Sequence, residues 1–186
     1  MALDPAELEI VDYPDPVLRR KATPVPRVTD EVRAVVRRMI ELMHEAEGVG
    51  LAAPQVGLSW RLFVADVPPG EKGRSTTDVP PTATDGPRVY INPVLSHPAD
   101  GIEPYEEGCL SLPDIRGEVL RPKTITITAM DVEGQTFTSI ATGLLARCWQ
   151  HEVDHLDGIL ILDRMTQAFR IKNRTKIKAL EREAGM

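Results

Sequence analysis

The segment His151-Glu152-Val153-Asp154-His155 constrains this chain more than any other part of its sequence. Two histidines four residues apart share one face of an α-helix, because the helix turns once in about 3.6 residues. A pair of imidazoles at this spacing can bind one cation, and Glu152 lies beside the coordination position that stays open. The segment therefore predicts a helix that carries a metal site with a base, and metal-assisted hydrolysis as its chemistry.

The size of the chain fits a single globular domain over residues 1–186. Of its 186 residues, 42% are hydrophobic and 27% are charged, which is enough for a sizeable core. No apolar run approaches the roughly 18 residues of a membrane span, and the N-terminus lacks the pattern of a secretion signal. Two cysteines, Cys109 and Cys148, are too few for a disulfide framework. We therefore expect a soluble, cytoplasmic protein without a membrane partner.

Hydrophobic periodicity predicts helices over residues 30–46, 142–156 and 166–183, the second of which carries the histidines. Alternating or short apolar runs predict strands at 61–67, 89–92, 108–112, 118–121, 124–129 and 136–140. Strands and helices do not alternate regularly, which is typical of an α+β domain. We expect mixed, mostly antiparallel sheets packed around the central histidine helix, with a helix at the C-terminus.

Residues 68–87 interrupt this pattern with five prolines and three glycines. The segment has almost no large apolar side chain, so it cannot bury enough surface to offset the entropy of ordering. We expect a flexible insertion loop inside the domain and assign no function to it.

The two histidines need a third protein ligand, and its identity decides the class of enzyme. The long zinc-protease pattern would place a third histidine at Ile161, which cannot bind metal. His44 and His97 have no supporting motif. Cys109 alone would more often be a small buried hydrophobe, but it stands in the segment Glu107-Gly108-Cys109-Leu110-Ser111, after a residue without a side chain.

Three motifs in order make the chain resemble the peptide deformylase family throughout its length. They are Gly48-Val49-Gly50-Leu51-Ala52-Ala53-Pro54-Gln55, Glu107-Gly108-Cys109-Leu110-Ser111 and His151-Glu152-Val153-Asp154-His155. The segment Tyr13-Pro14-Asp15-Pro16-Val17-Leu18-Arg19 is also similar to the N-terminal arm of that family. One motif alone would be weak evidence, whereas three together are specific.

The resemblance implies Cys109, His151 and His155 as the ligands of one divalent metal ion. A site with one thiolate and two imidazoles accepts Fe(II), Zn(II), Ni(II) or Co(II). In this family the working metal is usually ferrous iron, so Fe(II) is expected, and Zn(II), Ni(II) or Co(II) can substitute for it. The sequence does not choose among them.

The resemblance also implies the reaction, which removes the formyl group from the N-terminal formylmethionine of newly synthesised proteins and releases formate. Glu152 would take a proton from the attacking water and return it to the departing amine. The Gln55 amide and the Leu110 backbone N–H would stabilise the developing oxyanion. Without the resemblance, Gln55 would be read as a loop residue that caps backbone groups.

The substrate would be a formylmethionyl nascent peptide, whose side chain needs a deep apolar pocket. Residues expected to bind it are Val49, Gly50, Glu107, Gly108, Arg116, Leu144 and Cys148. Arg116 and Arg121 match family positions that contact substrate or support the site through Glu107. Val49 and Leu144 as ordinary core, and Arg116 and Arg121 as ordinary surface charges, stay open. Arg147 departs from the apolar residue of several relatives, and we interpret it as a charge at the pocket rim.

The charge of the chain is divided unevenly. Its formal net charge is −6, yet residues 164–186 hold seven Lys or Arg against two Asp or Glu. An acidic body argues against specific DNA binding. A basic helix most often is a solvated face, but formylated substrates emerge from ribosomes, so we hypothesise a weak, transient ribosome contact through the C-terminal helix.

Two other classes of protein share parts of the pattern. A metal-dependent endopeptidase also uses two histidines spaced in this way, but it needs a different third ligand. A noncatalytic module with a structural metal would normally have four protein ligands and no need of Glu152.

Overall fold

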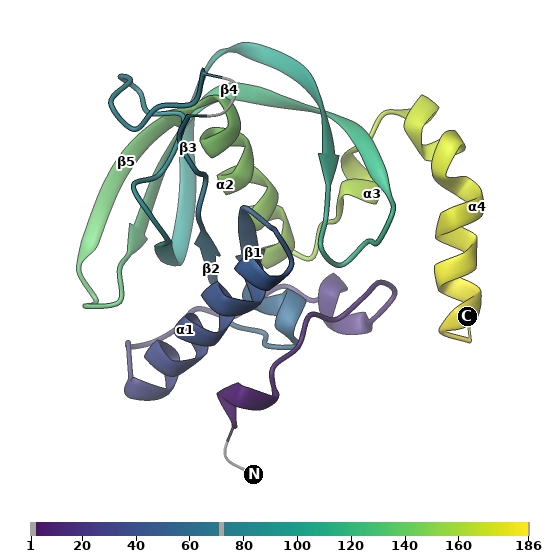
Figure 1. The fold of residues 1–186 in the computed structure, drawn as a ribbon, viewed down its shortest axis with the longest axis horizontal. Coiled ribbons are helices and arrows are strands. Elements are labelled where there is room, and N and C mark those ends of the chain that lie inside the picture. Colours follow the sequence, from purple (N-terminus) through teal and green to yellow (C-terminus); the bar gives the residue numbers. More distant parts are fainter. Residues whose placement is uncertain (1–2, 71–72, 186) are drawn as a thin grey trace.

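A computed structural model describes residues 3–70 and 73–185. Its five strands form one antiparallel sheet in which neighbours in sequence are neighbours in space. They are β1 (Gly50–Ala52), β2 (Leu62–Ala65), β3 (Arg88–Gly108), β4 (Arg116–Met130) and β5 (Thr136–Thr142). Helix α2 (Gly143–Leu156) lies in the middle of the molecule, and β3 and β4 arch over it (Figure 1). The predicted α+β class, with strands around the histidine helix and a C-terminal helix, is confirmed.

The long hairpin of β3 and β4 bends because its pairing is irregular. The register shifts between Ile91 and Val94, between Ser96 and Ala99, and between Ala99 and Ile102. Such irregularities increase the local twist and bend a strand. The hairpin therefore leaves the rest of the sheet, and its turn at residues 109–115 comes to lie over the histidine face of α2.

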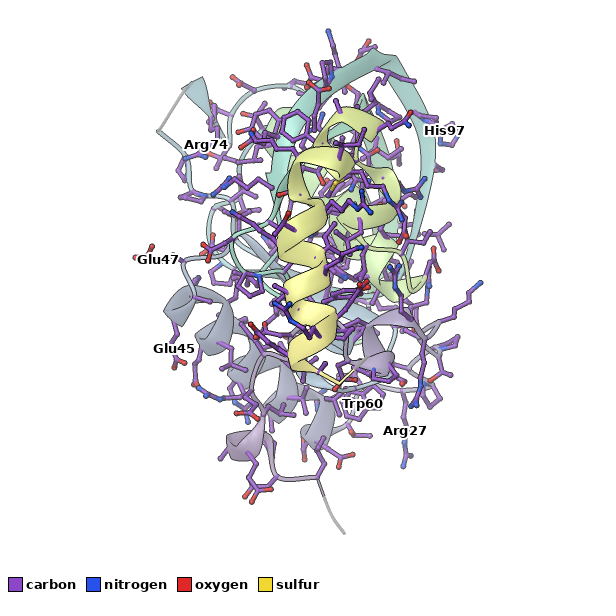
Figure 2. All side chains as sticks on the ribbon, turned by 90° about the vertical axis from the view of Figure 1, so that its right-hand side faces the viewer. Arg27, Glu45, Glu47, Trp60, Arg74 and His97 are labelled. Atoms are coloured by element: carbon purple, nitrogen blue, oxygen red, sulfur yellow. The ribbon has the colours of Figure 1, made fainter. Side chains whose placement is uncertain are left out.

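The helices other than α2 lie towards the outside of the molecule. Helix α1 (Asp30–Glu45) begins after Thr29, whose side chain caps Val32 N, and its apolar face packs into a cluster with β1 and β2. A short helix α3 (Ile161–Arg164) leads to α4 (Gln167–Glu183), which crosses the front of the molecule in Figure 2. Three 3-10 turns are η1 (Pro5–Glu7), η2 (Pro16–Arg19) and η3 (Ala53–Val56). The predicted helices differ from the observed ones by one residue at most at each end.

Helix α2 is enclosed on nearly all sides, with 11 of its 14 residues buried. One part of its surface joins an apolar cluster with the sheet, where the centre of the Trp149 ring lies 5.6 Å from the centre of the Tyr90 ring. The remaining surface carries charged and polar side chains that are also buried. Because buried polar groups need partners, these side chains must pair with the strands around the helix.

The strands beside the hairpin turn differ from the predicted ones. The predicted strand at 108–112 is wrong: β3 ends at Gly108, and the following residues form a turn in which Leu112 N donates to Cys109 O, since Pro113 and the left-handed Asp114 interrupt the strand. The predicted strands at 118–121 and 124–129 are one strand, β4.

The flexibility of residues 68–87 stays a prediction, although Ala83 and Thr84 are buried and Thr84 N donates to Val67 O.

Candidate metal centre and active site

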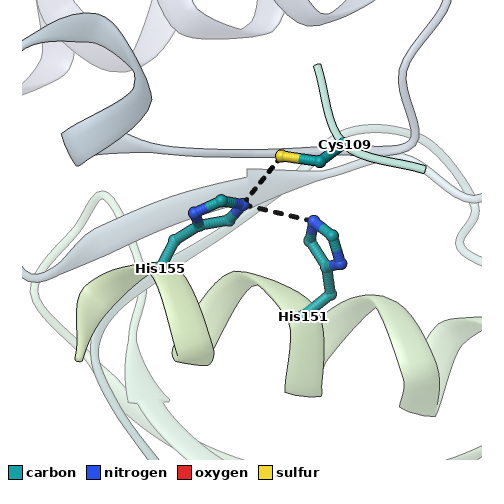
Figure 3. A group of neighbouring side chains, drawn as sticks. All are labelled: Cys109, His151 and His155. Carbon is teal, nitrogen blue, oxygen red and sulfur yellow. Dashed lines mark hydrogen bonds between the residues drawn. The ribbon is translucent and has the colours of Figure 1, made fainter. Parts of the chain in front are cut away.

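Two histidines of α2 and a cysteine of the hairpin turn meet at one point (Figure 3). His155 Nε2 lies 3.2 Å from His151 Nε2 and 3.3 Å from Cys109 Sγ. A tetrahedral ion with bonds of about 2.05 Å to nitrogen and about 2.3 Å to sulfur would set these separations near ~3.3 Å and ~3.6 Å. These two distances therefore fit one metal ion with shifts of only a few tenths of an ångström, and all three ligand atoms lie within 4.8 Å of one another.

The hairpin turn that carries Cys109 is anchored from a distant part of the chain. Tyr13 N donates to Ser111 O, and Val11 N donates to Gln55 O, so the N-terminal arm holds both this turn and the loop of Gln55. One of these loops follows the edge strand β1, and the other joins β3 to β4. This explains why motifs about 50 residues apart in sequence converge on one site.

The donor set fits a catalytic metal better than a structural one. Cys109, His151 and His155 form the one group of metal-ligating side chains found in the described part of the chain, with their ligand atoms within 4.8 Å of one another. Three protein ligands leave a position for water or substrate, whereas structural zinc sites are closed by four. One thiolate and two imidazoles suit iron, zinc, cobalt or nickel. The family expectation of a divalent metal thus agrees with the residues present.

Glu107 orients the first of these histidines. Its Oε2 lies 3.1 Å from His151 Nδ1, so the carboxylate can accept the Nδ1 proton and leave Nε2 free to bind metal. Arg121 donates to both oxygens of Glu107 at 2.7 and 2.9 Å. Burial raises the pKa of Glu107, but the hydrogen bonds from His151 and Arg121 outweigh it and hold the pKa far below its usual range. Glu107 therefore stays ionised at neutral pH.

The two histidines differ in their electrostatic surroundings. Burial lowers the pKa of His155 and keeps it in the neutral form that binds metal. Burial also lowers the pKa of His151, but its hydrogen bonds with Cys109 and Glu107 raise it overall. A metal ion would have to displace a proton from this pair, so its affinity must fall as the pH falls.

Glu152 is buried next to the ligands and to Gly50. A Cβ atom added to Gly50 would lie 2.4 Å from Glu152 Oε1, so only glycine leaves room for this carboxylate. Glu152 Oε2 is buried without a hydrogen-bond partner. Burial raises the pKa of Glu152 to about 7, although nearby His151 and Arg121 lower it. Such a carboxyl group can accept and return a proton near neutral pH.

The amide of Gln55 points its donor end at the metal centre. Gln55 Oε1 accepts from Ala52 N at 2.9 Å, which fixes the amide, and Nε2 lies 3.6 Å from Cys109 Sγ and 3.3 Å from Ser111 Oγ. Leu110 follows Cys109 in the hairpin turn and lines a cavity that also contacts Gln55, Cys109 and His151. Both predicted oxyanion donors are therefore near the ligands.

A cavity of about 620 Å³ opens onto Cys109, His151 and Glu152. It brings together all the residues that were predicted to bind substrate: Val49, Gly50, Glu107, Gly108, Arg116, Leu144 and Cys148. Burial raises the pKa of the Cys148 thiol well above its usual value, and its Sγ donates to Val49 O at 3.4 Å. Cys148 therefore forms an uncharged part of the cavity wall and does not belong to the group of Cys109, His151 and His155.

The other residues that the sequence analysis considered as ligands or as a charge at the pocket rim do not take those roles. His97 is exposed at the edge of the molecule (Figure 2), and His44 pairs with Asp66. Ile161 is buried in an apolar cluster around α3. The interpretation of Arg147 as a charge at the pocket rim is wrong: its side chain lines the cavity, but its guanidinium is buried against Glu107.

Sequence reasoning missed the ion pairs behind the site. Asp154 accepts from Arg121 Nη1 at 2.8 Å and from Arg164 Nη2 at 2.7 Å. The position of Asp154 inside the histidine segment was a signal, because a helix with so many buried positions must pair its carboxylates. Tyr105 and Glu106, which also line the cavity, had no recognisable signal.

Fold and site together define a metallohydrolase built on an antiparallel sheet, with one thiolate and two imidazoles below an open cavity. The family model described as polypeptide deformylase matches residues 7–170. The chain belongs to this family.

Curated relatives and solved structures agree. The chain is 39% identical over 174 residues to a peptide deformylase of Maricaulis maris, with 94% of each chain covered, and 43% identical over 173 residues to one of Acidobacterium capsulatum, with 93% and 95% covered. A plant peptide deformylase crystal structure superposes with a TM-score of 0.85 at 37% identity, covering 99% of this chain and 94% of the other. The Thermotoga maritima enzyme gives a TM-score of 0.75 at 40% identity, covering 86% and 97%.

Membership makes the chain a hydrolase that removes the N-formyl group from the N-terminal methionine of new proteins, in a family that depends on a metal ion. None of the helices in the described part of the chain combines the length and the apolarity that a membrane span needs.

Proposed function

We propose that Cys109, His151 and His155 hold one divalent metal ion, ferrous iron in the cell, and that Glu152 is the general base of the deformylation. The observation that supports this most is the convergence of the three ligand atoms, with the buried Glu152 carboxylate beside them, at one cavity. Zinc, nickel or cobalt would fit the same donors.

The chain's own residues divide the work of the reaction. An ion bound by these ligands would supply Lewis acidity, polarising the formyl oxygen and making water more acidic. Glu152 accepts the proton of the attacking water and passes it to the amine that leaves. Gln55 Nε2 and the Leu110 N–H donate to the oxygen that becomes negative, and such donors contribute about 3 to 4 kcal/mol each. Formate and a free α-amine are the products.

The formylmethionyl peptide would lie along β1 and the hairpin turn. Strand β1 is an edge of the sheet, so its free side can pair with an extended peptide. Gly50 and Gly108 let the peptide backbone approach closely. Val49, Leu144 and Cys148 would form the apolar pocket for the methionine side chain, and Arg116, at the mouth of the cavity, would contact the peptide.

The competing classes have less support. An endopeptidase of the long zinc-protease pattern would need a third ligand where Ile161 lies buried among apolar side chains. A structural metal would need a fourth protein ligand, and the metal-ligating group among the described residues has three.

One assay separates these classes. Protein purified without oxygen should release formate from formyl-Met-Ala-Ser and should not cleave an unformylated peptide of the same sequence. A metal-loaded, folded sample that releases no formate would contradict the proposal. Cleavage of the unformylated peptide would favour an endopeptidase.

Two substitutions test the roles of single residues. Cys109→Ala should lose metal affinity, whereas Glu152→Ala should keep its metal and lose turnover. Metal content by atomic emission and formate release are measured on the same samples. Substantial turnover by the Glu152 variant would remove Glu152 as the base.

We also propose a weak ribosome contact through α4, and the cytoplasm as the site of action. Arg170, Lys172, Arg174 and Lys178 are exposed on this helix. Asn173 Nδ2 donates to Arg116 O, so deleting α4 would disturb the site, and charge reversal is the better test. The combined substitutions Lys172→Glu, Arg174→Glu and Lys178→Glu should weaken salt-sensitive cosedimentation with ribosomes while formyl-Met-Ala-Ser turnover is kept. Unchanged cosedimentation would contradict the contact.

A further inference from the structure

Arg147 is a buried cation that the reaction described above does not use. It lies on α2 one helical turn before His151 and is 5% exposed. A buried guanidinium is costly unless its donors are paired. The partners of Arg147 therefore indicate what it does.

The guanidinium of Arg147 ties α2 to both strands of the long hairpin. Its Nη1 donates to Glu107 Oε1 at 2.8 Å and to Val119 O at 3.1 Å, and its Nη2 donates to Glu103 O at 3.0 Å. The guanidinium carbon also lies 5.2 Å from the centre of the Tyr105 ring. Both terminal nitrogens of Arg147 therefore have acceptors within the hairpin, and the residue is buried, so its guanidinium is held by the hairpin and is not a solvated cation.

The contact with Glu107 leads directly to the metal centre. Oε1 of Glu107 accepts from Arg147 and from Arg121, and Oε2 accepts from Arg121 and faces His151 Nδ1. Glu107 and Arg121 belong to the hairpin, whereas Arg147 and His151 belong to α2. Arg147 therefore fixes the carboxylate relative to the helix that carries the metal-binding imidazole.

We propose that Arg147 is a positioning residue, which acts through Glu107 to hold the His151 imidazole with Nε2 directed at Cys109 and His155. This inference rests on the proposed metal site. It predicts that Arg147 sets how long the metal is retained and how fast the enzyme turns over, and that it has little part in peptide affinity. Outer partners of metal ligands typically change metal affinity or activity by about 10- to 100-fold.

The test compares Arg147→Met with a matched control, Arg164→Met. Arg164 also pairs with a carboxylate of α2, Asp154, but it does not touch Glu107. Both substitutions remove one guanidinium from the same group of ion pairs. Only the first removes a donor from the carboxylate that orients His151.

Arg147→Met should lose zinc to a chelator about tenfold faster than the parent and should shift the visible absorption of the cobalt-loaded protein. Its kcat should fall about tenfold while KM for formyl-Met-Ala-Ser changes less than twofold. Arg164→Met should match the parent in zinc loss and cobalt spectrum. Arg147→Lys, which keeps the charge but cannot reach all three oxygens, should lie between parent and Arg147→Met.

A double-mutant cycle identifies the route of the effect. If Arg147 acts through Glu107, then adding Arg147→Met to Glu107→Gln should change the zinc-loss rate much less than it does in the parent. Equal effects in both backgrounds would overturn the proposal. The proposal would also be overturned if Arg147→Met only lowered the melting temperature or raised KM, while the cobalt spectrum and the rate of zinc loss stayed unchanged. If Arg147→Met does not fold, Arg147→Lys is judged by the same measurements.

The parent protein distinguishes this failure from failure of the proposed function. If the parent binds no metal, or releases no formate when metal-loaded, the metal-centre proposal itself is wrong. If the parent is active and only the Arg147 comparison fails, the metal centre stands and Arg147 is structural.

Discussion

The two sides of α2 are buried to a similar degree but for different purposes. Leu145, Trp149 and Val153 face an apolar cluster with the sheet. Arg147, His151 and Glu152 face the hairpin turn and the cavity. On the first side, burial removes apolar surface from water and stabilises the fold. On the second side, the same burial shifts pKa values and strengthens ion pairs.

The difference suggests a division of roles within one helix. The apolar side holds α2 against the sheet, so the polar side can keep Glu152 without a hydrogen-bond partner on Oε2. An unpaired buried polar atom costs stability, which is acceptable where a substrate or water will meet it. Substitutions on one side should therefore change stability, and substitutions on the other should change turnover.

The largest effect is expected from Glu152→Gln on the polar side. The amide keeps the shape of the side chain but cannot accept a proton, and positioned acid–base groups contribute about 10²- to 10⁴-fold. We expect kcat to fall within that range, with metal content and melting temperature near those of the parent. The measurement is formate release by zinc- or iron-loaded protein. A variant that also lost several degrees of melting temperature would break the division between the sides.

Trp149→Ala should have a large effect of the opposite kind. The Trp149 side chain is 1% exposed and packs in the apolar cluster, and removing a buried Trp side chain typically costs about 3–5 kcal/mol. For a chain of this size we expect the melting temperature to fall by about 6–20 °C. The kcat of the folded protein should stay within about twofold at a temperature well below the transition. If kcat fell as much as in the Glu152 variant, the two sides would not be separable.

Gln55→Leu extends the comparison to a residue that faces the polar side of α2 but does not belong to this helix. The substitution keeps an apolar stem of similar size but removes the amide that points at Cys109, and loss of one oxyanion donor costs about 10²- to 10³-fold in kcat. Metal content should be unchanged, because Gln55 is not a ligand. The control is Ser111→Ala, which removes the hydroxyl near Gln55 Nε2 and should have a smaller effect. Loss of metal in the Leu variant would show that Gln55 supports the ligands.

Much of the site could be predicted from sequence because its residues stand in short motifs. The spacing of His151 and His155 requires a shared helix face, and the helix bounds followed from apolar periodicity and Gly158. Cys109 as third ligand came from the resemblance of the chain to a family, since no spacing rule links it to histidines more than 40 residues further along the chain. The fold class followed from the irregular order of strands and helices.

The features that could not be predicted depend on the direction that the backbone or a side chain takes in the folded protein. Pro113 and Asp114 turn the chain where an apolar run indicated a strand, and the register shifts that bend β3 have no clear sequence pattern. Arg147 was placed at the pocket rim because its helical position faces the cavity. A long flexible side chain can turn back from such a position, and the acceptors that draw it inward, Glu107 and two carbonyls, belong to distant strands.

The smallest expected effect concerns the response of the apolar side to alkaline pH. Tyr90 is 3% exposed, its ring stacks on Phe63 at 4.6 Å, and burial raises the pKa of its hydroxyl well above 10. Above about pH 10 the unfolded chain loses this proton while the native protein keeps it. The unfolded state then binds fewer protons, so stability must fall with rising pH, by up to about 1.4 kcal/mol per pH unit for this group.

Tyr90→Phe removes that contribution and keeps the ring. The free energy of unfolding in urea, measured from pH 9 to 11 on the zinc-loaded protein, should therefore fall less steeply above about pH 10 in the variant than in the parent. The buried Cys148 thiol, whose pKa is also raised by burial, remains in both proteins and cancels in the difference. Activity at neutral pH should be equal, since Tyr90 does not line the catalytic cavity. Identical slopes of the free energy of unfolding against pH in the two proteins would mean that water reaches Tyr90 in the native protein. The apolar side of α2 would then be more accessible to water than the polar side.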